Sequence, residues 1–566
     1  MSITPKGFFD SIRQHARLPS SAAAFPKIVM SRIHGARNSD AVCDQLLHLI
    51  SQQFSIAETV HTREPNRSNL TYDTNGGGNE AGAAGALWGG MEAVERRSAD
   101  LLVALQARAA PQTAVIHIHP APEGDRGPLL SLEACASVEI TSPTDAAYQS
   151  LVCALVAAMS PTSHREPDGS VDDLAKRITA VSDELGVQIK DSLARSEVGE
   201  QTMVWQTYAA CLHWLGANGG WVNHLVEATR YYHVSLNPLT RRTTPLLWAT
   251  IQNNLGIALC KIDELAPSPQ RLSQAIEAFE SGLGAISPRQ APVLKSALNA
   301  NLARANLRLF KAEADAQYLG RAIEAFETAL RGQPKGQLSS RWASLCDGLG
   351  IALCELGTTN GDQNTLIQSI NTFRAAQESR GQNQAGSAAH WTWVNLGRAL
   401  CRLGTLQSGG YRLLEGAEIL RKASRNIDRQ LQPHNWSDVQ DEIGAALLVA
   451  GRREQNAEHL YEAIAALTAS LGARDRERHP AEWSLTQVRI GRAFHLLGKL
   501  LSKRDTEADR DGAQRCYESA ERACSEAHAA YVALGATEQA EQMSEQIDKI
   551  RTALAAVSGE ETSSSE

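Results

Sequence analysis

The stretch WATIQNNLGIALC at residues 248–260 returns 94 residues later as WASLCDGLGIALC, at residues 342–354. Both copies begin with Trp, carry Gly eight positions later and end in Ile-Ala-Leu-Cys. A chain that repeats a stretch at a fixed distance predicts a modular architecture, in which one structural unit is used several times.

The underlying period is half that distance. Steps of 47 residues from Gly256 reach a small residue every time, at Ala303, Gly350, Gly397, Gly444 and Gly491. The same step from Trp248 reaches Trp again at positions 342, 436 and 483, in a chain that has ten Trp among 566 residues. A second stretch, QAIEAFESGL at 274–283, returns in phase as RAIEAFETAL at 321–330. The sequence therefore predicts six units of 47 residues.

Each unit has the pattern of two amphipathic helices. Trp248, Ile251 and Leu255 fall on one helical stripe of the first segment, and Ile276 and Phe279 begin a similar stripe in the second. Segments rich in Pro, Gly, Asn and Asp separate the two stripes. One helix pair cannot bury its own apolar face, so the pairs are expected to be antiparallel and to stack on one another. A Gly inside a helix costs about 1 kcal/mol relative to Ala, so its repetition predicts a backbone contact too close for a side chain.

These residues resemble the tetratricopeptide repeat (TPR) family over roughly residues 243–530. The resemblance rests on the repeated Trp, the Leu-Gly pair in the first helix, the small residue that opens the second helix (Ala275, Ala322) and the aromatic that follows it (Phe279, Phe326, Phe373). It implies a mainly α protein, a right-handed α-solenoid of antiparallel helix pairs. The unit is longer than the 34 residues typical of the family, and longer loops can absorb the difference. A HEAT-like array, whose period is near 47 residues, remains an alternative.

The region before the repeats has a different pattern. Short apolar segments at 27–33, 55–60, 99–105, 113–120 and 129–140 predict strands, and segments such as 39–54 and 145–159 predict helices between them. This alternation predicts a smaller α/β domain in front of the solenoid. The stretch SADLLVAL at 98–105 is similar to the amino-terminal α/β domain of TolB-like proteins, and no site motif comes with it.

The expected domain organisation follows from these patterns. It comprises an N-terminal arm (1–25), the α/β domain (26–160), a helical linker (161–199), a capping helix pair (200–240), six TPR-like repeats (241–535), a C-terminal capping helix (536–556) and a disordered acidic tail (557–566).

Sequence motifs for catalysis are absent. The chain has no Walker P-loop, no G-x-S-x-G and no H-E-x-x-H, which predicts a protein that is not an enzyme and needs no cofactor or metal. One alternative is a divergent metal-dependent enzyme, because His117 and His119 alternate along one strand and could take His34 or Glu133 as a further ligand. A second alternative is a signalling regulator whose α/β domain senses a small ligand.

The composition of the chain limits the kinds of partner that it could bind. The formal net charge of −8 gives no overall basic field for nucleic acid or an anionic membrane, and no run of 18 apolar residues predicts a membrane-spanning helix. Ten scattered Cys without a C-x-x-C pair, and no secretory signal, indicate free thiols in a reducing compartment. We expect a bacterial cytoplasmic protein that binds neither nucleic acid nor membrane.

The TPR resemblance implies that the first helices line a concave groove that binds a protein or peptide. The residues of this chain at the corresponding positions are Asn253, Asn254, Asn301, Arg304, Arg308, Asn395, Arg398, Arg402 and Arg492. An Asn amide both donates to and accepts from a peptide backbone, and the planar Arg guanidinium matches a carboxylate. The pattern predicts a non-catalytic scaffold for a partner with an acidic or C-terminal carboxylate segment. The alternative is that these arginines only solvate the helices or pair with neighbouring Glu.

Overall fold

The computed structural model describes two parts of the chain. One part is a set of five strands between residues 27 and 140, and the other is a series of helices between residues 205 and 558. Within the helical region, the residues that the structure does not describe are 206–208, 210–211, 214–215, 218–219, 238, 243–244, 287–291, 333–339, 381–386 and 505. The chain divides into two compact units, Met1–Ser339 and Ser340–Glu566. We describe each unit by itself.

The five strands form one mixed sheet. They are β1 (Lys27–His34), β2 (Ser55–Arg63), β3 (Leu101–Ala107), β4 (Ala114–Pro120) and β5 (Ala136–Ile140). Their order is β2-β1-β3-β4-β5, with β1 parallel to β2 and β3, and β4 antiparallel to β3 and β5. Each strand overlaps a predicted one. The helices at 39–54 and 145–159 lie outside the described residues, so the α/β class and the TolB resemblance stay predictions.

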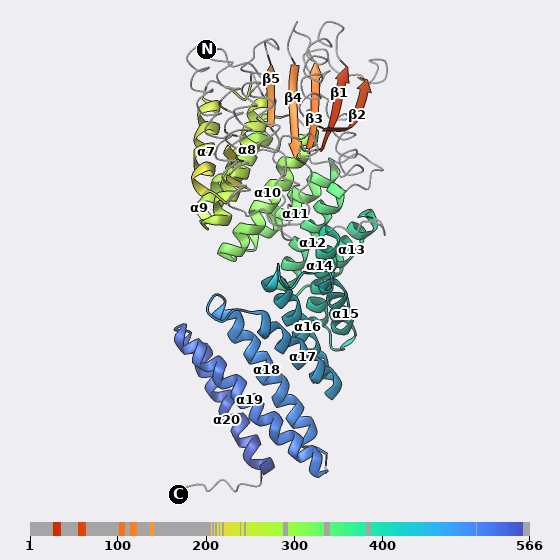
Figure 1. The fold of residues 1–566 in the computed structure, drawn as a ribbon, viewed down its shortest axis with the longest axis vertical. Helices are drawn as coiled ribbons and strands as arrows, with labels where there is room; N and C mark the ends of the chain where they lie inside the picture. The colour runs from red at the N-terminus through yellow and green to blue at the C-terminus, as the bar shows by residue number, and fades with distance from the viewer. Residues whose placement is uncertain are drawn as a thin grey trace. The chain divides into compact units, whose positions relative to one another are not determined.

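The first unit continues with helices that pack in sequential pairs. They are α7 (Val222–Leu236), α8 (Pro245–Leu265), α9 (Pro269–Ala285), α10 (Pro292–Glu313) and α11 (Gln317–Arg331). The two closest pairs are α8 with α9 and α10 with α11, and α9 also packs on α10 (Figure 1). These pairs match the two helices predicted for each 47-residue unit.

The second unit contains the remaining helices, and it keeps the same pairing. They are α12 (Ser340–Asn360), α13 (Gln363–Arg380), α14 (Ser387–Leu406), α15 (Tyr411–Ser424), α16 (Pro433–Glu454), α17 (Ala457–Ala473), α18 (Pro480–Leu501), α19 (Glu507–Ala533) and α20 (Thr537–Ser558). Each first helix packs on the second helix that follows it, and each pair packs on the next pair, as in a solenoid.

Local sequence accounts for where the helices begin and end. Helices α9, α16 and α18 begin with a proline, at Pro269, Pro433 and Pro480. A backbone N–H in the first turn has no hydrogen-bond partner within the helix, so the N–H that proline lacks costs no hydrogen bond there. The Thr506 side chain accepts from the backbone N–H of Asp509 and caps α19. Gly361 has φ +66° between α12 and α13, in the left-handed region that side chains disfavour.

The repeated Gly is a close-approach position, and the approaching group is a side chain. A Cβ on Gly256 would lie 2.5 Å from Cε1 of Phe279, and a Cβ on Gly444 would lie 2.5 Å from Cγ of Leu467. A backbone carbonyl of the second helix also lies close at some of these positions, as expected: a Cβ on Gly444 would be 3.1 Å from the Ala463 oxygen. The nearest group at each position, however, is a side chain of the second helix. Two residues after this Gly position every repeat has a buried Ala, namely Ala258, Ala305, Ala352, Ala399, Ala446 and Ala493.

Candidate partner-binding site

Most of the predicted partner-binding residues lie on one face of the first helices. We call this face the first-helix stripe and define it by the positions two before, one after and five after the repeated small residue. In the first unit it comprises Asn254, Ile257 and Lys261 on α8 and Asn301, Arg304 and Arg308 on α10. In the second unit it comprises Gly348, Ile351, Glu355, Asn395, Arg398, Arg402, Glu442, Ala445, Val449, Arg489, Arg492 and Leu496.

The asparagines of the first unit bond to one another. Asn301 Nδ2 donates to Asn253 Oδ1 at 3.0 Å, and Asn253 Nδ2 donates to Asn254 Oδ1 at 3.4 Å. Arg304 Nη1 donates to Asn301 Oδ1 at 3.3 Å. All four side chains are buried. The amides that the sequence predicts as a peptide clamp thus link α8 to α10, and their binding of a partner stays a prediction.

Arg308 is also engaged within the first unit. Its Nη1 donates to Glu264 Oε1 at 2.8 Å, and its Nη2 pairs with Asp263 Oδ2. Lys261 Nζ lies 3.2 Å from the same Glu264 carboxylate. The Arg308 guanidinium therefore links α10 to the end of α8. This agrees with the alternative stated above, that these arginines pair with neighbouring acidic residues.

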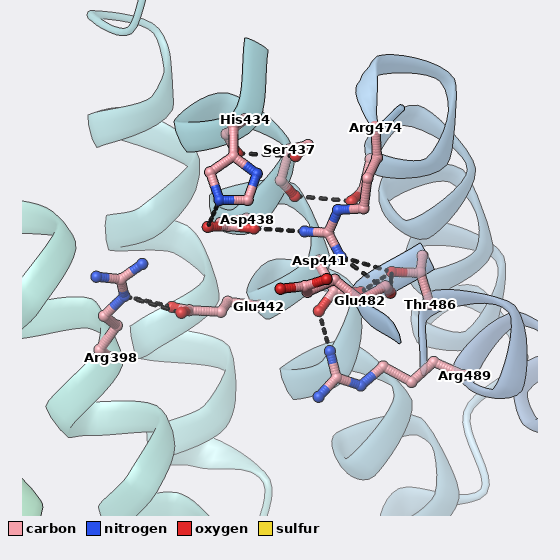
Figure 2. Close-up of polar contacts among 11 residues, drawn as sticks. Arg398, His434, Ser437, Asp438, Asp441, Glu442, Arg474, Glu482, Thr486 and Arg489 are labelled. Carbon is pink, nitrogen blue, oxygen red and sulfur yellow. Dashed lines mark hydrogen bonds and ion pairs between the residues drawn. The ribbon is translucent and has the colours of Figure 1, made fainter. Parts of the chain in front are cut away.

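In the second unit, two arginines converge on one turn of α16 from the helices on either side. Arg398 Nε of α14 donates to both carboxylate oxygens of Glu442, at 2.8 and 2.9 Å. Arg489 Nη1 of α18 pairs with Asp441 Oδ2 (Figure 2). Burial lowers the pKa of Arg398, but the Glu442 carboxylate outweighs it, and the pKa lies above its usual value. Asp441 and Glu442 thus tie together three successive first helices.

Arg402 and Arg492 differ from these paired arginines. Both side chains are exposed, and neither has a hydrogen bond or ion pair to another residue in the part of the chain that the structure describes. The pKa of Arg489 is lowered by burial and then by the positive charges of Arg402 and Arg492, which places the three guanidiniums in one electrostatic neighbourhood. We call Arg402, Arg489 and Arg492 the basic cluster.

Tyr531 on α19 also belongs to this neighbourhood. Burial raises the pKa of its hydroxyl, and Arg492 and Arg489 act in the opposite direction. A phenol near two guanidiniums supplies a hydrogen-bond donor for an anionic guest. Tyr531 was not predicted, because α19 lies beyond the last full repeat and no repeat position points to it.

Asn395, the remaining predicted residue, is buried at 6% exposure on α14. It stands 94 residues before Arg489, at the same repeat position. At this repeat position α14 thus has an uncharged Asn where α18 has an Arg. The arginines of α14 lie one and two turns further along the helix, at Arg398 and Arg402. Partner binding by Asn395 stays a prediction.

Two polar triads join neighbouring repeats of the second unit. Arg380 donates to Asp347 Oδ2 at 2.6 Å and to Thr392 Oγ1 at 2.5 Å, and Thr392 donates to Asp347 Oδ2 at 3.0 Å. The three equivalent residues 94 positions later are Asp441, Arg474 and Thr486. Arg474 Nη1 donates to Thr486 Oγ1 at 3.1 Å, and Thr486 donates to Asp441 Oδ1 at 2.9 Å (Figure 2). Neither triad was predicted from the sequence, although the 94-residue spacing is visible in it.

Asp441 connects the second triad to Arg489 of the first-helix stripe. Asp441 uses Oδ1 for Thr486 and Oδ2 for Arg489. Asp347 Oδ1 in the first triad is buried without a partner among the described residues, and burial raises the pKa of that carboxyl. The second triad is therefore the more fully satisfied copy, and it positions Arg489.

The candidate metal ligands of the N-terminal region receive little further support. His117 and His119 lie two positions apart on β4, as predicted, and His34 is the last residue of β1. Glu133 lies outside the described residues. Among the residues that the structure describes, no group of three or more His, Cys, Asp or Glu could hold a metal ion. The alternatives of a metal-dependent enzyme and a ligand sensor stay predictions.

The repeated Cys position is a packing position. Burial raises the pKa of Cys260 and Cys401 to about 12 and that of Cys354 to about 11. Thiols with such pKa values are protonated near neutral pH and are poor nucleophiles and metal ligands. In the same described part of the chain, no helix is long and apolar enough to cross a membrane.

Comparisons with known proteins do not identify a family. No family model matches the chain. No curated protein matches it either. Structural similarity was found to the apo form of RapI, with 12% identity over 69% of this chain and 97% of that chain and a TM-score of 0.36. A Rap protein complexed with competence and sporulation factor matches with 11% identity, 68% and 98% coverage and a TM-score of 0.32.

A third similar structure is a signal transduction ATPase with a tetratricopeptide repeat sensor from Pyrococcus horikoshii. It has 12% identity over 94% of this chain and 77% of that chain, with a TM-score of 0.27. TM-scores at this level carry no argument for a shared fold or function. The repeat architecture of this chain therefore rests on its own helices and their 47-residue register.

Proposed function

We propose that this protein is a non-catalytic scaffold that binds a protein or peptide partner on the first-helix stripe of the unit Ser340–Glu566. One observation carries the proposal: Arg402 and Arg492 are exposed on this stripe and have no partner among the residues that the structure describes, whereas Arg398 and Arg489 beside them are paired. Exposed guanidiniums on packed helices present donors at fixed positions, which favours recognition of carboxylates.

The local charge supports an acidic partner. Of the four arginines of α14 and α18, Arg398 and Arg489 pair with Glu442 and Asp441 of α16, whereas Arg402 and Arg492 are exposed and have no ion pair among the described residues. The chain as a whole has a net charge of −8, so this positive surface is a local exception. Charge complementarity of this kind steers association and selects the partner.

The asparagines of the first unit have a structural role in this proposal. Asn253 and Asn301 are 1% and 0% exposed, so they offer a guest almost no surface. Their mutual hydrogen bond fixes the register of α8 against α10. We therefore assign recognition to the arginines of the second unit and registration of the helices to the asparagines of the first.

The test selects peptides from a displayed random library on the full-length protein and measures the affinity of the enriched sequences. We expect enrichment in Asp and Glu, and at least a tenfold loss of affinity in R402E/R492E. The matched control R515E/R522E makes the same charge change at two exposed positions of α19 and should bind as the wild type does.

Thermal unfolding of the variants separates binding from folding. Because Arg402 and Arg492 have no described partner, R402E/R492E should unfold at the wild-type temperature. The proposal is wrong if no peptide is enriched, or if enriched peptides bind R402E/R492E as tightly as the wild type.

A further inference from the structure

The two arginines of α18 in the basic cluster lie beside each other on that helix. Arg489 and Arg492 are three residues apart, a separation that places the Cβ atoms of helical residues about 5–6 Å from each other. Among the described residues, Arg489 bonds only to Asp441, through Nη1. Figure 2 shows its other Nη nitrogen pointing away from Asp441. Arg489 therefore keeps unused donors next to the exposed guanidinium of Arg492.

A third donor comes from the neighbouring helix. The ring of Tyr531 on α19 packs against a buried cluster that contains Val488, the residue directly before Arg489. Its hydroxyl has no hydrogen bond to another residue that the structure describes. Arg492 and Arg489 both act on the pKa of this hydroxyl, so it lies in the electrostatic neighbourhood of both guanidiniums. We call these three residues the three-donor site.

The positive charge of the three-donor site exceeds the negative charge that the described residues supply to it. Burial, and then the charges of Arg402 and Arg492, lower the pKa of Arg489. On the α19 side, the Glu526 carboxylate accepts a hydrogen bond from Gln487. An anionic guest at this position would offset the repulsion among the guanidiniums.

The number of donors favours a phosphoryl group over a carboxylate. A phosphomonoester carries a charge of about −1.5 to −2 at neutral pH and has three acceptor oxygens. A carboxylate carries one negative charge and has two oxygens in one plane, which a single guanidinium can satisfy. Because the donors come from two helices, three oxygens around a tetrahedral phosphorus match them better than two coplanar oxygens do.

We infer that Arg489, Arg492 and Tyr531 bind a phosphorylated side chain of the partner peptide. The phosphoryl oxygens accept from the two guanidiniums and from the Tyr531 hydroxyl. Asp441 positions Arg489 for this role, and the Thr486 hydroxyl in turn donates to Asp441 Oδ1 at 2.9 Å. This inference rests on the proposed function and specifies the group that the same surface recognises.

The test compares three peptide pools on the full-length protein. Each pool has random residues around one fixed central position, which is phosphoserine, glutamate or serine. We expect the phosphoserine pool to be retained at least tenfold more strongly than the glutamate pool, and the serine pool to stay at background. Fluorescence anisotropy then gives the affinity of individual enriched phosphopeptides, and enzymatic dephosphorylation of the same peptides should abolish measurable binding.

Variants of the protein locate the site. Y531F removes only the hydroxyl and should weaken phosphopeptide binding about tenfold, because hydrogen bonds to charged groups are stronger than neutral ones. The matched control Y461F makes the same change at an exposed position of α17 and should have no effect. R492Q should weaken binding at least tenfold, whereas R515Q, at an exposed position of α19, should not. Unfolding temperatures verify that all four variants are folded.

Other outcomes separate this inference from the proposed function. If the glutamate and phosphoserine pools are retained equally and both are lost in R492Q, the site recognises carboxylates, so the inference is wrong and the scaffold function stands. Wild-type phosphopeptide affinity in both Y531F and R492Q would overturn the inference. So would heparin or single-stranded DNA that binds as tightly as the phosphopeptides and depends equally on Arg492, because the surface would then be a general polyanion site. If no pool is retained and the random library also yields nothing, the proposed function fails as well.

Discussion

Gly256 packs so closely against the ring of Phe279 that a Cβ on the glycine would lie 2.5 Å from Cε1. The same relationship joins Gly350 to Phe373, and Leu420 and Leu467 take the place of the ring at Gly397 and Gly444. Each contact joins the first helix of a repeat to its second helix. The repeated Gly is therefore retained for packing within the repeat, in spite of its low helix propensity.

Substituting this Gly should destabilise the protein. In G256A the methyl group forces the buried ring of Phe279 to move, which costs about 1–3 kcal/mol and exceeds the gain of about 1 kcal/mol in helix propensity. Chemical denaturation should show a net loss of about 1–2 kcal/mol. In contrast, Gly320 of α11 has nothing within 4 Å of its Cβ position, so G320A should be neutral or stabilising. Stabilisation by G256A would contradict the packing argument.

The Arg453 side chain caps the C-terminal end of α14 by hydrogen bonds to its carbonyl groups. Its guanidinium donates to the carbonyl oxygens of Gly404, Thr405 and Gly409, at 2.7, 2.8 and 3.1 Å. Carbonyls at a helix end have no partner within the helix, and hydrogen bonds from a charged donor are worth about 1.5–3 kcal/mol. We expect R453A to lower stability by about 2 kcal/mol in thermal unfolding.

The neighbouring residue provides the control for this change. Arg452 is exposed on the same helix and has no hydrogen bond or ion pair to another described residue. R452A should shift the unfolding temperature little. Equal effects of R452A and R453A would show that the carbonyl contacts do not matter.

The first polar triad can be replaced by residues that the chain already uses elsewhere. One repeat later, the positions of Asp347, Arg380 and Thr392 hold Val394, Ile427 and Val439, which belong to one buried apolar cluster. Replacing a buried ion pair by apolar residues is often neutral or stabilising, whereas removing one partner costs about 3–5 kcal/mol. The triple variant D347V/R380I/T392V should therefore retain wild-type stability, and R380I alone should lose about 3 kcal/mol.

Calorimetric unfolding measures both variants. A triple variant that is as unstable as R380I would mean that the polar contacts themselves, and not the avoidance of an unpaired buried carboxylate, hold this junction together.

The burial of His213 should make the stability of the folded protein depend on pH. The side chain is 3% exposed, with Nδ1 3.4 Å from the Tyr232 hydroxyl, and burial followed by the charge of Lys261 lowers its pKa from 6.5 to about 3. Below pH 6.5 the unfolded chain binds a proton at this site that the folded chain does not. The stabilising contribution is thus complete above about pH 6.5 and is lost as the pH falls towards 3, by about 1.4 kcal/mol per pH unit.

The variant H213Q removes this titration. Its unfolding free energy should depend less steeply on pH between 6.5 and 4 than that of the wild type, while H233Q, at an exposed position of α7, should keep the wild-type slope. Denaturant titrations at several pH values test this. An unchanged slope in H213Q would show that His213 is not the group responsible.

Much of the architecture could be predicted because each repeat carries the same local signals. The spacing of Trp248, Leu255 and Gly256 predicted the first helix of the repeat, and Ile276 and Phe279 predicted the second. The boundary between the units at Ser339 and Ser340 could not be predicted, because the 47-residue register runs through it without a change. The exposure of Arg402 and the pairing of Arg398 could not be predicted either, since the two residues are four positions apart on the same helical face.

The sequence by itself determined the repeat, its period and the helical character of each segment, because periodicity and helix propensity act over neighbouring residues of the chain. Only the tertiary structure decided which polar residues face one another across helices. Asn253 meets Asn301 at a separation of 48 residues, and Arg398 meets Glu442 at a separation of 44. Such contacts depend on the stacking of whole repeats, and this stacking decides which charges are neutralised and which stay exposed.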